Sequence, residues 1–207
     1  MTKQILNIFT IIVIGIAVIG CKKATETSIS GTETALKSEA SSQKYVVNTT
    51  ESVIEWKGFK PTGSHNGTIS VEKGVFTTDN GKISSGNFLI NMNSIKDSES
   101  NARLEGHLKS LDFFDVEKFP NARFEVTEIK ENMLSGNLTI KDITNNVSFP
   151  ILISQDGDAM SFTSETFKIN RSKWNIRYKS KSFFNDLGDK FIDDDVEIKI
   201  TIKANKG

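Results

Sequence analysis

The regular alternation of apolar and polar residues along short segments is the feature that most limits what this chain can fold into. The alternation is clearest near the C-terminus, where every second residue is a branched aliphatic one. The residues that would share one face of this segment are Val196, Ile198, Ile200 and Ile202. A period of two is typical of a β-strand with one buried and one solvated face. The chain is therefore expected to be built mainly of half-buried strands.

The same alternation recurs along most of the sequence. The segments that show it are 52–57, 67–76, 86–92, 122–127, 134–140, 147–153 and 160–169. Asn80-Gly81, Asn145-Asn146 and Asp156-Gly157 are predicted as turns between them. Many short strands joined by Gly and Asn turns predict an antiparallel sandwich or barrel. The long, half-apolar last strand suits closure against the first, which favours a barrel.

The segment Leu104–Phe124 departs from this pattern. Leu104, Leu108 and Leu111 have the spacing i, i+4, i+7, which predicts a short helix around residues 98–111. The four phenylalanines that accompany it are Phe113, Phe114, Phe119 and Phe124. Two interpretations follow, a plug of the hydrophobic core or a lining of a cavity for an apolar ligand.

The first twenty residues are predicted to be a bacterial lipoprotein signal peptide. Lys3 precedes an apolar run from residue 5 to residue 19, and small residues lead into Cys21. Cys21 would be lipidated and become the mature N-terminus; as the only cysteine it forms no intrachain disulfide. An ordinary membrane anchor is the alternative, but the run is shorter and more broken than a span of about 20 apolar residues.

Residues 21–43 are predicted to be the lipidated cysteine and a disordered tether, because after Cys21 they contain no aromatic residue and are rich in Ser, Thr, Glu and Lys. A single folded domain would then occupy residues 44–207. The expected location is the cell envelope, lipid-anchored and facing the periplasm. Lys22 follows the cysteine in place of an Asp that retains some lipoproteins in the inner membrane, which mildly favours the outer membrane.

Composition excludes some functions. Lys and Arg total 26 and Asp and Glu total 26, whereas a nucleic-acid binder usually has a basic excess. His65 and His107 are the only histidines, and no third ligand stands at a recognisable spacing, so no metal site is predicted. No Gly-x-Ser-x-Gly elbow or phosphate-binding loop is present. The sequence therefore predicts no catalytic residues and no enzyme.

A cationic run lies in the C-terminal third of the chain, interleaved with Trp174 and Tyr178. Its members are Arg171, Lys173, Arg177, Lys179 and Lys181. It is either a solvated face or a cradle for the anionic head group of a lipid. The acidic residues Asp193–Asp195 follow at a spacing that fits no EF-hand, and are interpreted as counter-charges to the run.

Several blocks taken together resemble the YceI-like family, over about residues 45–204. The blocks are Trp56–Gly58, Gly63–Gly67, Gly86–Ile90, His107–Ser110 with Asp112–Asp115, Phe119-Pro120, Phe124, Gly136–Lys141, Thr144, Val147 and Phe149. Ser182–Lys190 resembles a variant of the family often seen in lipoproteins. The resemblance implies an all-β fold, an eight-stranded antiparallel lipocalin-like barrel with a short helical plug.

The resemblance also implies an extracytoplasmic protein that holds a polyisoprenoid or fatty chain in a hydrophobic barrel cavity, for transport, storage or envelope stress protection. Residues expected to contact the ligand are Trp56, Phe88, His107, Leu108, Phe113, Phe114, Phe124, Leu138, Ile140, Phe149 and Trp174. Candidates for the head group are His65, Arg171, Lys173 and Arg177. The expected partners are this lipid-like molecule and, through the N-terminal lipid, a membrane; no other cofactor is expected, and a homodimer stays open.

Two other functions remain as alternatives. One is an enzyme that acts on a lipid or an isoprenoid quinone. The other is a structural envelope module with a solid core and no ligand.

Overall fold

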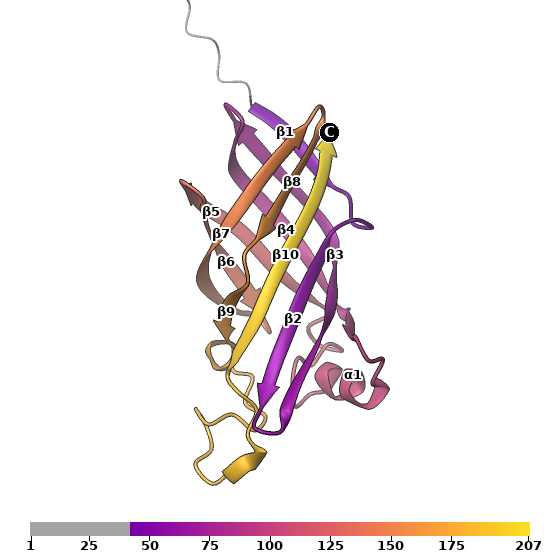
Figure 1. Cartoon of the computed structure of the whole chain (residues 1–207), viewed down its shortest axis with the longest axis vertical. Coiled ribbons are helices and arrows are strands. Elements are labelled where there is room, and N and C mark those ends of the chain that lie inside the picture. The colour runs from indigo at the N-terminus through magenta and orange to yellow at the C-terminus, as the bar shows by residue number, and fades with distance from the viewer. Residues whose placement is uncertain (1–41) are drawn as a thin grey trace, which may run out of the picture. The chain divides into compact units, whose positions relative to one another are not determined.

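Strands dominate the part of the chain that the computed structural model describes, residues 42–207 (Figure 1). The strands are β1 (Ser42–Val47), β2 (Val53–Lys60), β3 (Gly63–Asp79), β4 (Lys82–Asp97), β5 (Asn121–Lys130), β6 (Met133–Ile140), β7 (Ile143–Asp156), β8 (Ala159–Ser164), β9 (Phe167–Asn170) and β10 (Asp195–Lys206). The helices are α1 (Ala102–Lys109) and two single 3-10 turns, η1 (Arg171–Trp174) and η2 (Gly188–Lys190).

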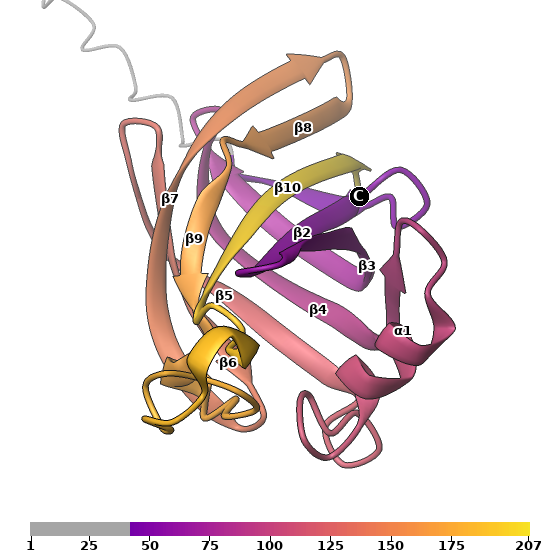
Figure 2. The ribbon, with the colours of Figure 1, turned by 60° about the horizontal axis from the view of Figure 1, so that its bottom comes forward.

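All the strands belong to one antiparallel sheet that closes on itself. Neighbouring strands pair in sequence from β2 to β8, and β10 closes the ring by pairing with β2 on one side and β8 on the other. β8 and β9 pair with successive stretches of β10. β1 and β2 likewise follow one another between β10 and β3, and each of them pairs with both of these strands (Figure 2). The ten segments therefore occupy eight positions around the ring, and the predicted eight-stranded antiparallel barrel is confirmed.

The predicted turns are partly confirmed. Asn80-Gly81 forms the β3–β4 hairpin with φ values of 51° and 76°, and Asp156-Gly157 forms the β7–β8 hairpin. The turn predicted at Asn145-Asn146 is wrong, because both residues lie within β7. The Asn146 side chain donates to Asn137 on β6 at 3.2 Å, so its amide serves a cross-strand contact. The chain turns at Lys141-Asp142, where φ is 49° and 58°.

The helix is shorter than predicted. It begins after Asn101, whose side chain accepts a hydrogen bond from the Leu104 amide at 3.1 Å, and it ends at Lys109. Leu108 is buried and Leu104 is half-buried, as their spacing predicted. Leu111 is 75% exposed, because it follows the helix end and no longer shares a face with the other two leucines.

The first described strand starts slightly earlier than expected. The domain was predicted to begin at residue 44, but Ser42 and Gln43 already pair with Asp79 and Thr78 of β3. The predicted signal peptide, Cys21 and the tether up to residue 41 lie outside the described residues. Within residues 42–207, no helix combines the length and the apolar character needed to cross a bilayer.

The interior of the barrel is solid near β1 and hollow toward α1. Tyr45 stacks on Phe76 with ring centroids 5.2 Å apart, and each of these side chains is 1% exposed. Along the inner face of β10, Ala204 and Ile202 are each 2% exposed, whereas Ile200 and Ile198 on the same face are only half-buried. Close packing therefore stops partway along the barrel axis.

Candidate functional site: the barrel cavity

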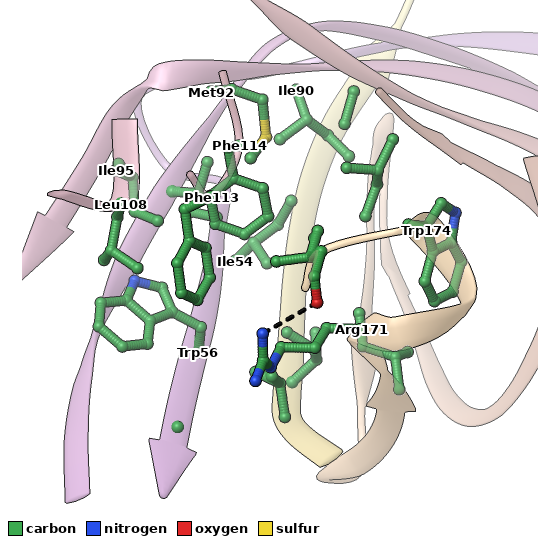
Figure 3. Close-up of a pocket in the computed structure, with 18 of the residues that line it drawn as sticks. Ile54, Trp56, Ile90, Met92, Ile95, Leu108, Phe113, Phe114, Arg171 and Trp174 are labelled. Carbon is green, nitrogen blue, oxygen red and sulfur yellow. Dashed lines mark hydrogen bonds between the residues drawn. The ribbon is translucent and has the colours of Figure 1, made fainter. Parts of the chain in front are cut away.

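A cavity of about 510 Å³ occupies the hollow half of the barrel (Figure 3). Aliphatic side chains from β2, β3, β4 and β10 make much of its wall, among them Ile54, Ile69, Val71, Ile90, Ile198 and Ile200. This volume lies within the range of about 300–1,000 Å³ that is usual for small-molecule sites. The cavity is therefore large enough for a guest and is lined mainly by apolar atoms.

Phenylalanines separate the cavity from the solid half of the barrel. Phe88 lies with its ring centroid 6.3 Å from that of Phe124 and 5.9 Å from that of Phe162, and all three rings line the cavity. Gly136 on β6 faces Phe124, and a Cβ at this glycine would collide with the Phe124 ring. The close approach of ring and backbone thus requires glycine at this position. We call the three rings of Phe88, Phe124 and Phe162 the aromatic floor.

The segment that contains α1 covers one side of the cavity. α1 contributes Leu104, His107 and Leu108 to the lining, and Phe113 and Phe114 follow from the turn beyond it (Figure 3). The two phenylalanine rings pack edge to face with centroids 5.3 Å apart. Phe113 is only 7% exposed, so it belongs to the hydrophobic core and lines the cavity at once. Phe113 thus combines a core position with a place in the cavity wall, and its contact with an apolar ligand stays a prediction.

Hydrogen bonds fix this segment to the barrel. The Asp97 carboxylate accepts from the Glu99 amide at 3.1 Å, and the Glu105 carboxylate accepts from the Asp97 amide at 3.0 Å. On the far side, the Lys141 ammonium donates to the Phe113 carbonyl at 2.9 Å. The segment is thus held on both sides of α1, by the turn that precedes the helix and by the turn that follows it.

Two buried nitrogens in the lining have no hydrogen-bond partner among the described residues. They are Nε1 of Trp56, a side chain that is 9% exposed, and Nε2 of His107. The His107 ring lies between Tyr178 and Phe113, with centroid distances of 4.3 Å and 5.9 Å. An unmet hydrogen bond of this kind costs about 1–3 kcal/mol. These nitrogens are the polar groups of the wall that the protein itself leaves unsatisfied.

The cavity opens at the α1 end of the barrel. The lining residues that are themselves exposed to solvent are Lys60, Asn101 and Arg103. Lys60 ends β2, and Asn101 and Arg103 lie at the start of α1. His65 near the start of β3 and Lys179 in the segment after η1 complete this end of the lining. We call this opening the mouth.

Comparison with known proteins decides the family. The model of the YceI-like domain matches residues 45–204 of this chain. The chain belongs to the YceI-like family. The UPF0312 protein of Serratia proteamaculans is 31% identical over 143 residues, which cover 67% of this chain and 72% of that protein. A UPF0312 protein of Staphylococcus aureus is 36% identical over 80 residues, a match that spans only 47% of that protein.

Two solved structures share the fold of this YceI-like domain. BcnA of Burkholderia cenocepacia superposes with a TM-score of 0.61 at 22% identity, over 76% of this chain and 98% of that one. A polyisoprenoid-binding domain from Saccharophagus degradans superposes with a TM-score of 0.59 at 12% identity, over 79% of this chain and 98% of that one. At these identities the likeness establishes the architecture.

The YceI-like barrel gathers most of the residues that the sequence singled out. Each of the residues expected to contact a ligand lines the cavity: Trp56, Phe88, His107, Leu108, Phe113, Phe114, Phe124, Leu138, Ile140, Phe149 and Trp174. They come from β2, β4, β5, β6, β7, α1, the turn after it and η1. Their contact with a ligand stays a prediction, but their convergence on one cavity is a property of the fold.

Of the four head-group candidates, Arg171 lines the cavity but is fully engaged by the protein. Its side chain is 2% exposed and donates to the carbonyls of Asp193 at 3.0 Å, Ile176 at 2.9 Å and Ile192 at 2.9 Å (Figure 3). Its guanidinium also lies 3.3 Å from the Asp194 carboxylate. Burial lowers the pKa of the Arg171 guanidinium, and Asp194 and Asp193 oppose that shift. Arg171 thus cross-links the segment around η1, and this interpretation replaces its predicted head-group role.

Asp194 is the counter-charge that the sequence suggested for the cationic run. Its carboxylate accepts from the Ser182 hydroxyl at 2.6 Å and from the Ser182 amide at 3.3 Å. Burial would raise the pKa of Asp194, but hydrogen bonds from Ser180 and Ser182 and the charge of Arg171 hold it below its usual range. The carboxylate is therefore kept ionised beside Arg171.

Lys173 and Arg177 are exposed and do not line the cavity, so the structure corrects their predicted place at a head group. Their exposure agrees with the other interpretation of the run, a solvated face, whereas η1 is a 3-10 turn that directs residues three apart, Arg171 and Trp174, inward. Arg177 instead donates to the Asn175 side chain at 2.5 Å and stacks over the Phe183 ring at 4.8 Å.

His65, the remaining candidate, lies at the mouth close to two carboxylates. Its Nδ1 is 3.7 Å from the Asp97 carboxylate, and possible ligand atoms of His65, Asp97 and Glu99 lie within 4.8 Å of one another. The sequence showed no third ligand because Asp97 ends β4 and Glu99 lies in the turn after it, more than thirty residues from His65. Asp97 already accepts amide hydrogen bonds in the turn before α1, so this turn accounts for the arrangement.

Sequence reasoning missed Lys60 and Arg103 as members of the mouth. Lys179 belonged to the cationic run that was interpreted as a possible cradle for a head group, but it was not among the four head-group candidates. One signal was present for Arg103, because it stands four residues before His107 and thus on the same face of a helix. Lys60 carried no comparable signal, since its nearness to Lys179 depends on how two distant segments pack.

Proposed function

We propose that this YceI-like barrel binds one long apolar chain, a polyisoprenoid or a fatty chain, inside its cavity. The observation that carries this proposal is the cavity of about 510 Å³, with apolar walls, an aromatic floor and one solvent-facing mouth. The polyisoprenoid-binding domain of Saccharophagus degradans, whose fold this chain shares, supports the choice of guest. A long apolar chain suits a cavity with apolar walls better than a compact polar molecule does.

Burial of the chain would supply the binding free energy. Each methylene transferred from water to an apolar wall contributes about 0.8 kcal/mol, so ten buried methylenes contribute about 8 kcal/mol before the costs of association. Those costs are about 4–15 kcal/mol. Affinity is therefore expected to rise steeply with the length of chain that fits within the barrel.

The lining favours binding over catalysis. Among the side chains that line the cavity, polar groups come from Lys, Arg, His, Asn, Tyr and Trp, and none is a Ser, Thr, Cys, Asp or Glu. A covalent mechanism on a lipid would place a hydroxyl or thiol nucleophile next to a base in this space. The hollow interior likewise favours a carrier over a solid structural module.

The test of this function is a search for a native guest, followed by titration of the delipidated protein. Organic extraction of the purified protein is expected to release one apolar molecule per chain, identified by mass spectrometry. Both tryptophans, Trp56 and Trp174, line the cavity, so intrinsic fluorescence should report the titration of a polyprenol or a fatty acid. Absence of both a native guest and a fluorescence response would reject the carrier function, and turnover of the bound molecule would favour the enzyme.

We also propose that the domain is a membrane-anchored lipoprotein of the cell envelope that transports, stores or protects its guest. The support is the apolar run before Cys21 and the polar composition of the following residues. The Cys21→Ala variant is expected to remain unprocessed and to lack the mass of a diacylglycerol. Intact-mass spectrometry of the membrane fraction checks this result, and a lipid-modified Cys21→Ala protein would contradict the anchor.

A further inference from the structure

We propose that the mouth of the cavity binds an anionic head group, held by Lys60, Arg103 and Lys179. The ligand would then be an anionic amphiphile, a chain that ends in a phosphate or a carboxylate, and not a neutral lipid. This inference rests on the proposed function, because it assigns the polar end of the same guest.

Three segments that are distant in sequence bring these cations to one opening. The Asp193 amide donates to the Phe59 carbonyl at 2.9 Å, next to Lys60 at the end of β2. The Ile192 amide donates to the Lys179 carbonyl at 2.9 Å, so the strand end that carries Lys60 and the segment that carries Lys179 are joined by consecutive hydrogen bonds.

Arg103 reaches the same opening from α1. It lies one helical turn before His107, whose ring is 4.3 Å from the ring of Tyr178, the residue before Lys179. All three cations and both aromatic neighbours line the one cavity. The charges therefore surround the entrance to the apolar space.

None of the three cations forms an ion pair in the described part of the chain, although Asp97 and Glu99 lie beside His65 at the mouth. Within residues 42–207, the cavity lining contains no carboxylate. Nearby cations behave differently, since Lys96 lies 3.3 Å from Glu105 and Arg171 lies 3.3 Å from Asp194. Cations grouped at a cleft with low-dielectric walls attract and hold anions.

His107 lines the cavity next to the cations. Its Nε2 is buried and has no partner among the described residues, although its ring contacts the lining on both sides. A phosphate or carboxylate offers several acceptor oxygens, and bonds from charged donors to such oxygens are short and strong. The end of the guest that lies at the mouth would therefore be its charged end, with the chain directed toward the aromatic floor.

The experiment compares geranylgeranyl monophosphate with geranylgeraniol, which share a chain and differ in the head group. Each is titrated into delipidated protein by tryptophan fluorescence. Wild type is expected to bind the phosphate at least about tenfold more tightly, equivalent to about 1.4 kcal/mol. The Lys60→Gln/Arg103→Gln/Lys179→Gln variant should lose this preference and keep its affinity for the alcohol. The preference should also shrink as salt is added.

A matched variant removes the same number of charges elsewhere. Lys57, Lys173 and Arg177 are exposed and lie outside the lining, so the Lys57→Gln/Lys173→Gln/Arg177→Gln variant should keep the wild-type preference for the phosphate. Equal affinity of wild type for the two ligands, or equal loss in both variants, would overturn the head-group assignment while leaving chain binding intact. Failure of wild type to bind either ligand would instead reject the proposed function.

Inorganic phosphate distinguishes a lipid head group from a free anion. At millimolar concentration it is expected to leave the bound geranylgeranyl monophosphate in place, because it gains nothing from the apolar cavity. Displacement at that concentration would show a site for free phosphate and would overturn the assignment to an amphiphile.

Discussion

Replacing Ile198 by Trp is expected to abolish the binding of a long-chain guest while the barrel stays folded. Ile198 lies on the inner face of β10, lines the cavity and is only half-buried because the space beside it is empty. The indole would enter that space. If it displaces about four methylenes of the guest, the loss is about 3 kcal/mol, or more than a hundredfold in affinity. Fluorescence titration with a polyprenol measures the loss.

Lys199→Trp is the matched control, because the neighbouring residue adds the same ring to the outer face of the same strand. It should bind the guest as wild type does. Both variants should unfold in urea within about 1.5 kcal/mol of wild type, since the Ile198→Trp ring enters a hollow and does not overpack a filled core, for which about 1–3 kcal/mol is usual. A folded Ile198→Trp protein with unchanged affinity would mean that the guest does not occupy the cavity.

Replacing Arg171 by Met is expected to produce the largest loss of stability in the domain, about 3–5 kcal/mol, because it leaves the half-buried Asp194 carboxylate and three backbone carbonyls without their donor. Arg171 donates to three backbone carbonyls and faces Asp194, and its guanidinium lies over the Phe113 ring at 5.4 Å. Methionine can fill the volume but supplies no donor. The free energy of unfolding from urea denaturation checks the expectation.

Arg177→Met serves as the control, since Arg177 is exposed in the same segment; it should change the stability by no more than about 0.5 kcal/mol. Arg171→Lys should fall between the two, because one ammonium keeps the charge but cannot reach three carbonyls in the fixed geometry of a guanidinium. Equal stability of Arg171→Met and Arg177→Met would refute the cross-linking role of Arg171. Its guanidinium would then again be a candidate for binding the head group of the ligand.

The strands could be read from the sequence because their signal is local. Inner and outer residues alternate along each strand, as Ile198 and Lys199 do, and a period of two needs no knowledge of distant segments. The same pattern placed Phe88, Phe124 and Phe149 on inner faces, where they line the cavity. It failed at Asn145-Asn146, because asparagine also serves as an outward residue in a strand pair.

The polar part of the site could not be read in this way. In the sequence, the cations of the run from Arg171 to Lys181 cannot be told apart by residue type. In the structure, Arg171 is buried and donates to three carbonyls, whereas Lys173 and Arg177 are exposed to solvent. Composition could not predict which of these cations is buried. Burial depends on which backbone carbonyls surround each side chain after the segment that follows β9 has packed against the barrel.

The sequence by itself determined the class of fold, the inner face of nearly every strand and the family, because the period of two and the order of the motifs can be recognised without a structure. Only the tertiary structure decided that the interior is filled at one end and hollow at the other, because packing density depends on how rings such as Tyr45 and Phe76 meet across the barrel. It also decided which cations surround the mouth. Lys60 and Lys179 are neighbours because the barrel closes, and closure is a property of the whole sheet.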